Sequence, residues 1–141
     1  MDIRHVTPDY AVAPQIDLSD LAELAALGFT TLINNRPDDE VPPEIQSARM
    51  KAAAEDAGLV YVANPVINGA MTMDMVAAQG QAIADASGAV FAYCRSGTRS
   101  SIVWALSQSG RQPTDDILGA LAKAGYDLGG LRGQIEMLAK G

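Results

Sequence analysis

The sequence predicts an α/β fold in which a small central, mostly parallel sheet is flanked by helices. Short apolar runs alternate along the chain with longer helical segments, which is the pattern of βαβ units. Hydrophobic residues make up 48% of the 141 residues, enough to fill a buried core. No internal repeat, low-complexity tract or linker interrupts the alternation, so we expect residues 1–141 to form a single domain.

Four short runs predict the strands. Residues 10–13 are apolar, and residues 29–33 are rich in β-branched and apolar side chains, as in a buried strand. Residues 59–62 follow a helix-ending glycine, Gly58, and residues 89–93 form the last apolar run. Parallel pairing of these runs would bring their carboxyl ends to one edge of the sheet.

Helices are predicted wherever a capping or helix-starting residue precedes an apolar pattern that ends at a glycine or a polar turn. Gly28, Gly58 and Gly88 end three of the helices, and Pro43 suits the first turn of another. In chain order the predicted helices cover residues 18–27, 43–57, 72–86, 98–109, 114–124 and 131–139.

The only cysteine, Cys94, follows the last predicted strand and precedes a helix start. Unpaired N–H groups at a helix start favour an anion, and Arg99 supplies a positive fork suited to a phosphate or another oxyanion. Such surroundings favour the thiolate over the thiol, so we interpret Cys94 as a nucleophile. The alternative is a small, inert, buried cysteine.

Ligand sites in such sheets lie beyond the carboxyl ends of the strands, so the loops after residues 33, 62 and 93 are the candidate site. Arg36 is either a second anion contact or a solvated loop arginine. Asp38, Asp39 and Glu40 form either a solvated acidic turn or the source of a catalytic acid.

Composition excludes several classes of function. The formal net charge of −7 argues against nucleic-acid binding and against docking on an anionic membrane. A single cysteine excludes an internal disulfide framework, and His5 is the only histidine, so we expect neither a metal site nor a cofactor. With no signal-peptide pattern and no run of about 20 apolar residues, we expect a cytoplasmic protein.

The chain resembles the phosphatase-like domain family of beta-lactamase-hydrolase-like proteins, which has a dual-specificity-phosphatase-like fold. The resemblance rests on segments 7–15, 32–40, 62–66, 93–100 and 124–128. It implies a cysteine-phosphatase architecture in which Cys94 is the nucleophile, Arg99 the oxyanion clamp and Ser100 the hydroxyl next to the sulfur. Family members are also described as sulfurtransferases. The loop residues Arg95, Ser96, Gly97 and Thr98 would then bind the anionic substrate.

Three departures from the dual-specificity pattern matter. Tyr93 stands where those phosphatases carry a histidine, and four residues rather than five separate Cys94 from Arg99, as in the loop of rhodanese sulfurtransferases. Asn68 stands where the phosphatases carry their general acid. Like Arg36 and the residues of the loop, Asn68 is a candidate contact for the substrate. We expect Asp38 or Asp39 to supply that acid, with Asp74 as a further candidate.

Three functions follow, in the order in which we favour them. The first is a thiolate phosphatase that hydrolyses a small phosphate monoester through a phosphocysteine. The second is a sulfurtransferase that carries a persulfide on Cys94 and takes its sulfur from a sulfane-sulfur donor. The third is a non-catalytic module that binds anions or senses oxidants.

Overall fold

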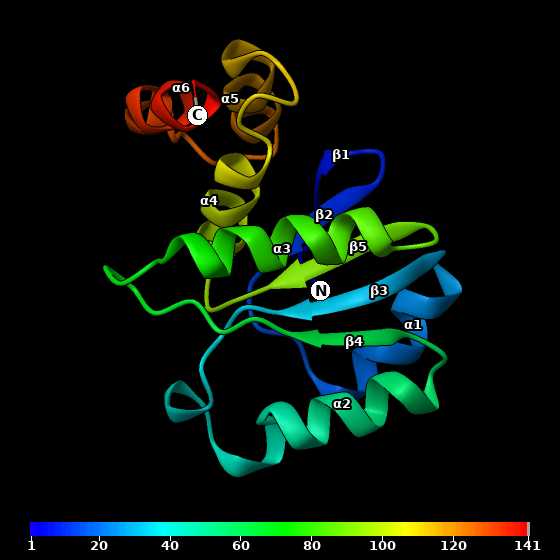
Figure 1. Cartoon of the computed structure of the whole chain (residues 1–141). Helices are drawn as coiled ribbons and strands as arrows, with labels where there is room; N and C mark the ends of the chain where they lie inside the picture. The colour runs from blue at the N-terminus through cyan, green and yellow to red at the C-terminus, as the bar shows by residue number, and fades with distance from the viewer. Residues whose placement is uncertain (141) are drawn as a thin grey trace.

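A single five-stranded sheet organises the computed structural model, which describes residues 1–140. The strands lie in the order β1-β2-β5-β3-β4 (Figure 1). Their bounds are β1 (Arg4–Thr7), β2 (Tyr10–Ala13), β3 (Phe29–Asn34), β4 (Val60–Ala63) and β5 (Ala89–Tyr93). β1 pairs antiparallel with β2, and all other pairs are parallel, which confirms the predicted mostly parallel sheet.

The edge strand β1 is absent from the sequence prediction. It has four residues, of which only Val6 is buried. A strand this short, with one buried side chain, carries no alternating hydrophobic pattern to detect. It forms a hairpin with β2 and extends the sheet by one strand at the edge far from the loop after β4.

Helices cover both faces of the sheet (Figure 1). Their bounds are α1 (Leu21–Ala26), α2 (Ser47–Asp56), α3 (Met73–Asp85), α4 (Thr98–Ser107), α5 (Thr114–Lys123) and α6 (Arg132–Ala139). Two predicted helices begin with a 3-10 turn: in 18–27 the turn Leu18–Asp20 runs directly into α1, whereas 43–57 is divided. Pro43–Ile45 forms a 3-10 turn, Gln46 is extended with ψ 168°, and α2 begins at Ser47. None of the helices in residues 1–140 is long and apolar enough to cross a membrane.

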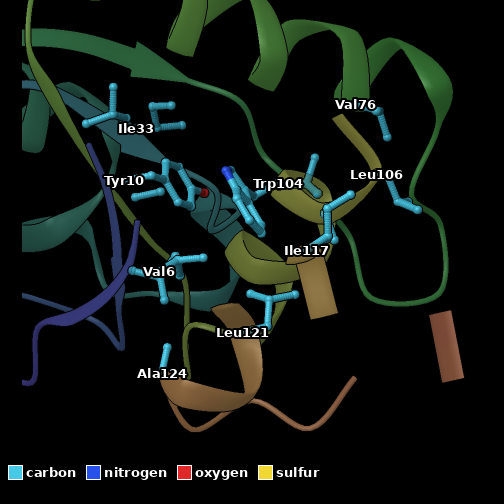
Figure 2. Close-up of a cluster of buried hydrophobic side chains, with 14 of the residues drawn as sticks. Val6, Tyr10, Ile33, Val76, Trp104, Leu106, Ile117, Leu121 and Ala124 are labelled. Atoms are coloured by element: carbon cyan, nitrogen blue, oxygen red, sulfur yellow. The ribbon is translucent and has the colours of Figure 1, made fainter. Parts of the chain in front are cut away.

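Successive residues of β5 point to opposite faces and fill two cores. Phe91 and Tyr93 pack on the face covered by α1 and α2. Val90 and Ala92 pack on the other face, where α3, α4, α5 and α6 contribute half of the buried side chains. On that face the rings of Tyr10 and Trp104 stack with centroids 5.7 Å apart (Figure 2). The central strand is therefore fixed on both sides, and Cys94 follows directly after it.

Candidate active site

Cys94 lies at the carboxyl end of the central strand, between β2 and β3. The pairing of the strands continues to this point, because the Cys94 amide donates to the Ala13 carbonyl at 3.3 Å and the Asn35 amide donates to the Tyr93 carbonyl at 2.9 Å. The cysteine is free and 0% exposed. The Gly97 amide donates to its sulfur at 3.1 Å.

The loop from Cys94 to Arg99 turns at Gly97, which has φ +90° and immediately precedes α4. A Cβ at Gly97 would overlap the hydroxyl oxygen of Tyr126. That hydroxyl donates to the Ser96 carbonyl at 3.0 Å, so the segment after α5 holds the loop from outside. The predicted substrate-contact residues Arg95 and Ser96 are exposed. Thr98 is half-buried, and Ser96 Oγ donates to Thr98 Oγ1 at 3.0 Å.

Arg99 is the main charged group beside the sulfur, and its side chain is only 6% exposed. Its Nη1 donates to Glu40 Oε2 at 2.8 Å and to the Val66 carbonyl at 2.8 Å, and its Nη2 donates to Glu40 Oε1 at 2.7 Å. A guanidinium has five N–H donors, so the Nε hydrogen and the second Nη2 hydrogen remain. These two lie on the same side of the planar group and form a fork for an anion.

Glu40 is ionised at neutral pH. The hydrogen bond from Arg99 is the main reason why its pKa lies below the ordinary value, and Arg36 adds to the effect. In turn, Glu40 is the main reason why the pKa of Arg99 is raised, with a smaller contribution from Cys94. From the sequence, Glu40 is expected to belong to a solvated acidic turn or to a source of catalytic acid; its pairing with Arg99 is not foreseen, because the two residues lie 59 positions apart.

Arg36 extends this ion-pair chain across the end of the sheet. Its Nε donates to Glu40 Oε1 at 3.3 Å, and its Nη1 donates to Gln15 Oε1 at 3.2 Å. Gln15 follows β2, and its backbone N–H donates to the Arg95 carbonyl at 3.4 Å. Arg36 is thus engaged in ion pairing at the mouth of the site and is not a freely solvated loop arginine.

Ser100 is fully buried on the first turn of α4. Its hydroxyl donates to Asn35 Oδ1 at 2.8 Å, and its carbonyl accepts from the Tyr10 hydroxyl at 2.8 Å. Asn35 also contacts Gln79, and all of these side chains are at least nine-tenths buried. Neither Asn35 nor Gln79 figured in the sequence analysis, because a neutral amide carries no local signal of a role.

The predicted acids lie around the site rather than on its loop. Asp38 is exposed, and its carboxylate accepts from the Ser47 amide at 2.7 Å, so it caps the start of α2. Asp39 and Asp74 are exposed on the turn after β3 and on the first turn of α3. Asn68 is also exposed, and with Arg99 it lines a cavity of about 280 Å³.

The comparisons with known proteins fit this geometry. Residues 2–111 match the model for the beta-lactamase hydrolase-like protein, phosphatase-like domain. The chain belongs to this family. A beta-lactamase hydrolase-like protein from Xylella fastidiosa is 34% identical over 131 residues, which are 92% of this chain. The chain spans only about 30% of the length of that relative.

Solved structures agree with the family assignment. A crystal structure from Neisseria meningitidis, described as that of a candidate phosphatase, is 31% identical with a TM-score of 0.83 and covers 98% of this chain and 99% of its own. TpbA from Pseudomonas aeruginosa, solved in complex with phosphotyrosine, shares the fold at 15% identity and a TM-score of 0.59, covering 95% and 90% of the two chains. The predicted cysteine-phosphatase-like architecture is therefore confirmed.

In this member of the family, a larger cavity of about 460 Å³ adjoins the ion-pair chain. Arg36 forms part of its wall, as do Pro65 and Ile67 on either side of the Val66 carbonyl that Arg99 binds. The remaining wall combines the apolar residues Pro37, Ala63 and Met75 with the polar residues Asn34, Asp38 and Ser47, so the predicted acid Asp38 borders this cavity together with Arg36. No cluster of three or more metal-ligating acidic, histidine or cysteine side chains occurs in residues 1–140.

Proposed function

We propose that this domain is a cysteine-dependent hydrolase of small phosphate monoesters that works through a phosphocysteine. The observation that carries the proposal is the joint placement of Cys94 and Arg99 around one loop. The Gly97 amide points at the sulfur at 3.1 Å, and Arg99 keeps one fork of N–H donors free. An anion held by that fork would bring its phosphorus close to the sulfur.

In the first step the Cys94 thiolate attacks phosphorus, a P–S bond forms, and the P–O bond to the leaving group breaks. Arg99 and the loop amides stabilise the charge on the remaining phosphate oxygens. In the second step a water oxygen attacks phosphorus, the P–S bond breaks, and its electron pair returns to the sulfur. The water proton passes to the phosphate product or to solvent.

The substrate we infer has a good leaving group, such as a phenol. Glu40 is held ionised by Arg99, so it is not a ready proton donor, and one oxygen of the Asp38 carboxylate is engaged by the Ser47 amide. Asn68 cannot donate as an acid does. The partly apolar cavity beside Arg36 suits the organic part of an aryl ester. The phosphotyrosine complex of TpbA supports the same class of substrate.

A second candidate, sulfur transfer, is favoured by one specific observation. The loop has four residues between Cys94 and Arg99, and the two carboxylates nearest to it are engaged elsewhere: Glu40 pairs with Arg99, and Asp38 accepts from the Ser47 amide. A persulfide on Cys94 would be formed and discharged by thiol–disulfide-type exchange, which needs no acid for an oxygen leaving group.

One paired assay separates the two candidates. The protein and its Cys94→Ser variant are each given p-nitrophenyl phosphate and, separately, thiosulfate with cyanide. The proposal expects nitrophenolate release that the variant lacks, and a phosphate adduct on Cys94 in mass spectra of quenched samples. Thiocyanate formation with one extra sulfur on Cys94 would establish the second candidate instead. Activity with neither substrate, together with reversible oxidation of Cys94, would favour the non-catalytic module.

A further inference from the structure

The Gly97 amide that points at the sulfur belongs to a peptide unit that is held at both ends. The unit joins Ser96 to Gly97, and its N–H donates to Cys94 Sγ at 3.1 Å. In a trans peptide the C=O points the opposite way from the N–H, so the Ser96 carbonyl faces away from the sulfur. There it accepts from the Tyr126 hydroxyl at 3.0 Å. One planar group therefore bridges the tyrosine and the cysteine.

The two neighbouring peptide units are held by other elements. The carbonyl of Arg95, in the unit before, accepts from the backbone N–H of Gln15 at 3.4 Å. The carbonyl of Gly97, in the unit after, accepts from the backbone N–H of Ser101 at 3.0 Å and from its hydroxyl at 2.8 Å. For the carbonyl of the middle unit, the Tyr126 hydroxyl is the only partner within the part of the chain that the structure describes. Tyr126 therefore holds a carbonyl that no other element holds.

Backbone sterics alone do not fix the orientation of this peptide unit. Gly97 has φ +90°, and glycine adopts negative φ values about as readily as positive ones. Rotation of the unit to a negative φ would turn its N–H away from Cys94 and its carbonyl oxygen towards the sulfur. A carbonyl oxygen in that place would oppose a negative charge on the sulfur, whereas the N–H stabilises it. The hydrogen bond from Tyr126 resists this rotation.

Tyr126 is itself fixed from two sides. Its backbone N–H donates to the Leu121 carbonyl at 2.8 Å at the end of α5, and the guanidinium of Arg4 lies 5.9 Å from the centre of its ring. Arg4 Nη1 also donates to the Ala124 carbonyl at 3.0 Å, which ties β1 to the end of α5. Burial is the main reason why the pKa of Tyr126 is raised, so the hydroxyl keeps the proton that it donates at neutral pH.

We propose that Tyr126 is a positioning residue, which holds the Ser96–Gly97 peptide unit with its N–H on the sulfur and thereby favours the thiolate of Cys94. Tyr126 lies outside residues 2–111, which match the family model, and it contacts the loop on the side opposite the sulfur. The consequence for catalysis rests on the proposed function. Without the tyrosine hydroxyl, a smaller fraction of Cys94 would be ionised at a given pH, and attack on phosphorus would be slower.

Arg99 stabilises the same thiolate from α4, and its contribution must be kept apart from that of Tyr126. The hydrogen bond from Arg99 to Glu40 is the main reason why the pKa of Arg99 is raised, and the charge and hydrogen bond of Cys94 add to the shift. Burial is the main reason why the pKa values of Tyr10 and Tyr126 are raised, and charge on Cys94 adds to both shifts. Tyr126→Phe removes one hydroxyl and leaves Arg99, Glu40 and Tyr10 in place.

The test is a titration of the Cys94 thiolate, followed by its ultraviolet absorbance. Cys94 is the only cysteine, and each protein is measured against its own Cys94→Ser form, which subtracts the signal of the tyrosines. We expect the midpoint to rise by about 0.4–1 pH unit in Tyr126→Phe, as the loss of one hydrogen bond predicts.

Tyr61→Phe is the matched control, because it also removes a hydrogen-bonded hydroxyl. The Tyr61 hydroxyl accepts from Asn34 Nδ2 at 3.0 Å and lies 2.7 Å from Ser47 Oγ. Tyr61 lies on β4, which β3 separates from β5, so its hydroxyl holds no part of the loop after β5. The midpoint in Tyr61→Phe should equal that of the unmodified protein.

Two results would overturn the proposal: a midpoint in Tyr126→Phe equal to that of the unmodified protein, or an equal rise in Tyr61→Phe. Hydrogen exchange of the Gly97 amide is a second measurement, and it should become about 2- to 10-fold faster in Tyr126→Phe. Unchanged exchange would also overturn the proposal.

Turnover of p-nitrophenyl phosphate is followed in parallel. Below the midpoint, kcat/KM should fall about 2- to 10-fold in Tyr126→Phe, in step with the fraction of thiolate. If the unmodified protein shows no turnover, the proposed function fails, while the titration and the amide exchange still decide the role of Tyr126.

Discussion

Substituting Gly97 by alanine tests how the loop around Cys94 keeps its shape. Two costs follow from the structure. Alanine in the left-handed backbone conformation at φ +90° lowers the free energy of unfolding by about 1–2 kcal/mol. Its Cβ also displaces the Tyr126 hydroxyl and breaks the bond to the Ser96 carbonyl, which is worth about 0.5–1.5 kcal/mol. Alanine also reduces the conformational entropy of the unfolded chain, which stabilises the folded state by about 0.4–1 kcal/mol. We therefore expect a net loss of about 0.5–3 kcal/mol.

The part due to Tyr126 is isolated by a double-mutant cycle. In a Tyr126→Ala background no hydroxyl stands in the way, so the cost of Gly97→Ala should fall by about 0.5–1.5 kcal/mol. Urea unfolding of the four proteins measures the coupling. Gly58→Ala is the matched control, because Gly58 has a similar φ of +86° and nothing lies within 4 Å of its Cβ position. Its cost should be the same with or without Tyr126.

Additive costs for Gly97→Ala and Tyr126→Ala, within about 0.3–0.5 kcal/mol, would refute the reasoning. A second readout is the reactivity of Cys94. Since the Gly97 amide donates to the sulfur, Gly97→Ala should change the rate of Cys94 alkylation at constant pH, whereas Gly58→Ala should leave it as it is.

Three further outcomes are expected. Glu40→Gln should lower the free energy of unfolding by about 1–2 kcal/mol, because Arg99 loses its counter-ion. Because the pKa of Glu40 is lowered in the folded protein, the difference in unfolding free energy between the unmodified protein and Glu40→Gln should be constant above about pH 4.3, the pKa of an unfolded glutamate. It should shrink as the pH falls below that value. Urea unfolding at several pH values measures it, and a difference that grows in acid would contradict the expectation. Arg99→Lys should weaken phosphate binding measured by calorimetry at least about 10-fold, because an ammonium cannot present a fork, and unchanged affinity would exclude Arg99 as the clamp. Asn68→Asp should raise kcat for phenyl phosphate about 10-fold or more while leaving p-nitrophenyl phosphate nearly unchanged, since only the poorer leaving group needs a proton; an equal change for both esters would place residue 68 away from the leaving oxygen.

The parts of the molecule that the sequence predicts well are those whose signal is local. The run from β5 through Cys94 to Arg99 joins a strand, a turn and a helix start within a few residues. These elements are neighbours in the sequence as well as in the structure, so their arrangement can be inferred from the sequence alone. The strand patterns of β3 and β5 are equally local, because each is buried on both faces.

The parts that sequence reasoning missed depend on long-range pairing. Glu40 meets Arg99 across 59 positions, and Ser100 meets Asn35 across 65. Tyr126 reaches the Ser96 carbonyl across 30. No pattern of hydrophobicity or spacing indicates such long-range contacts, so the sequence could not identify Glu40 as the partner of Arg99 or Asn35 as the partner of Ser100.

The complete coverage of Cys94 has a consequence for the protein outside any reaction. Cys94 is 0% exposed, so its sulfur presents no surface to a thiol carried on another macromolecule. Preparations kept without reductant should therefore stay free of covalent dimers.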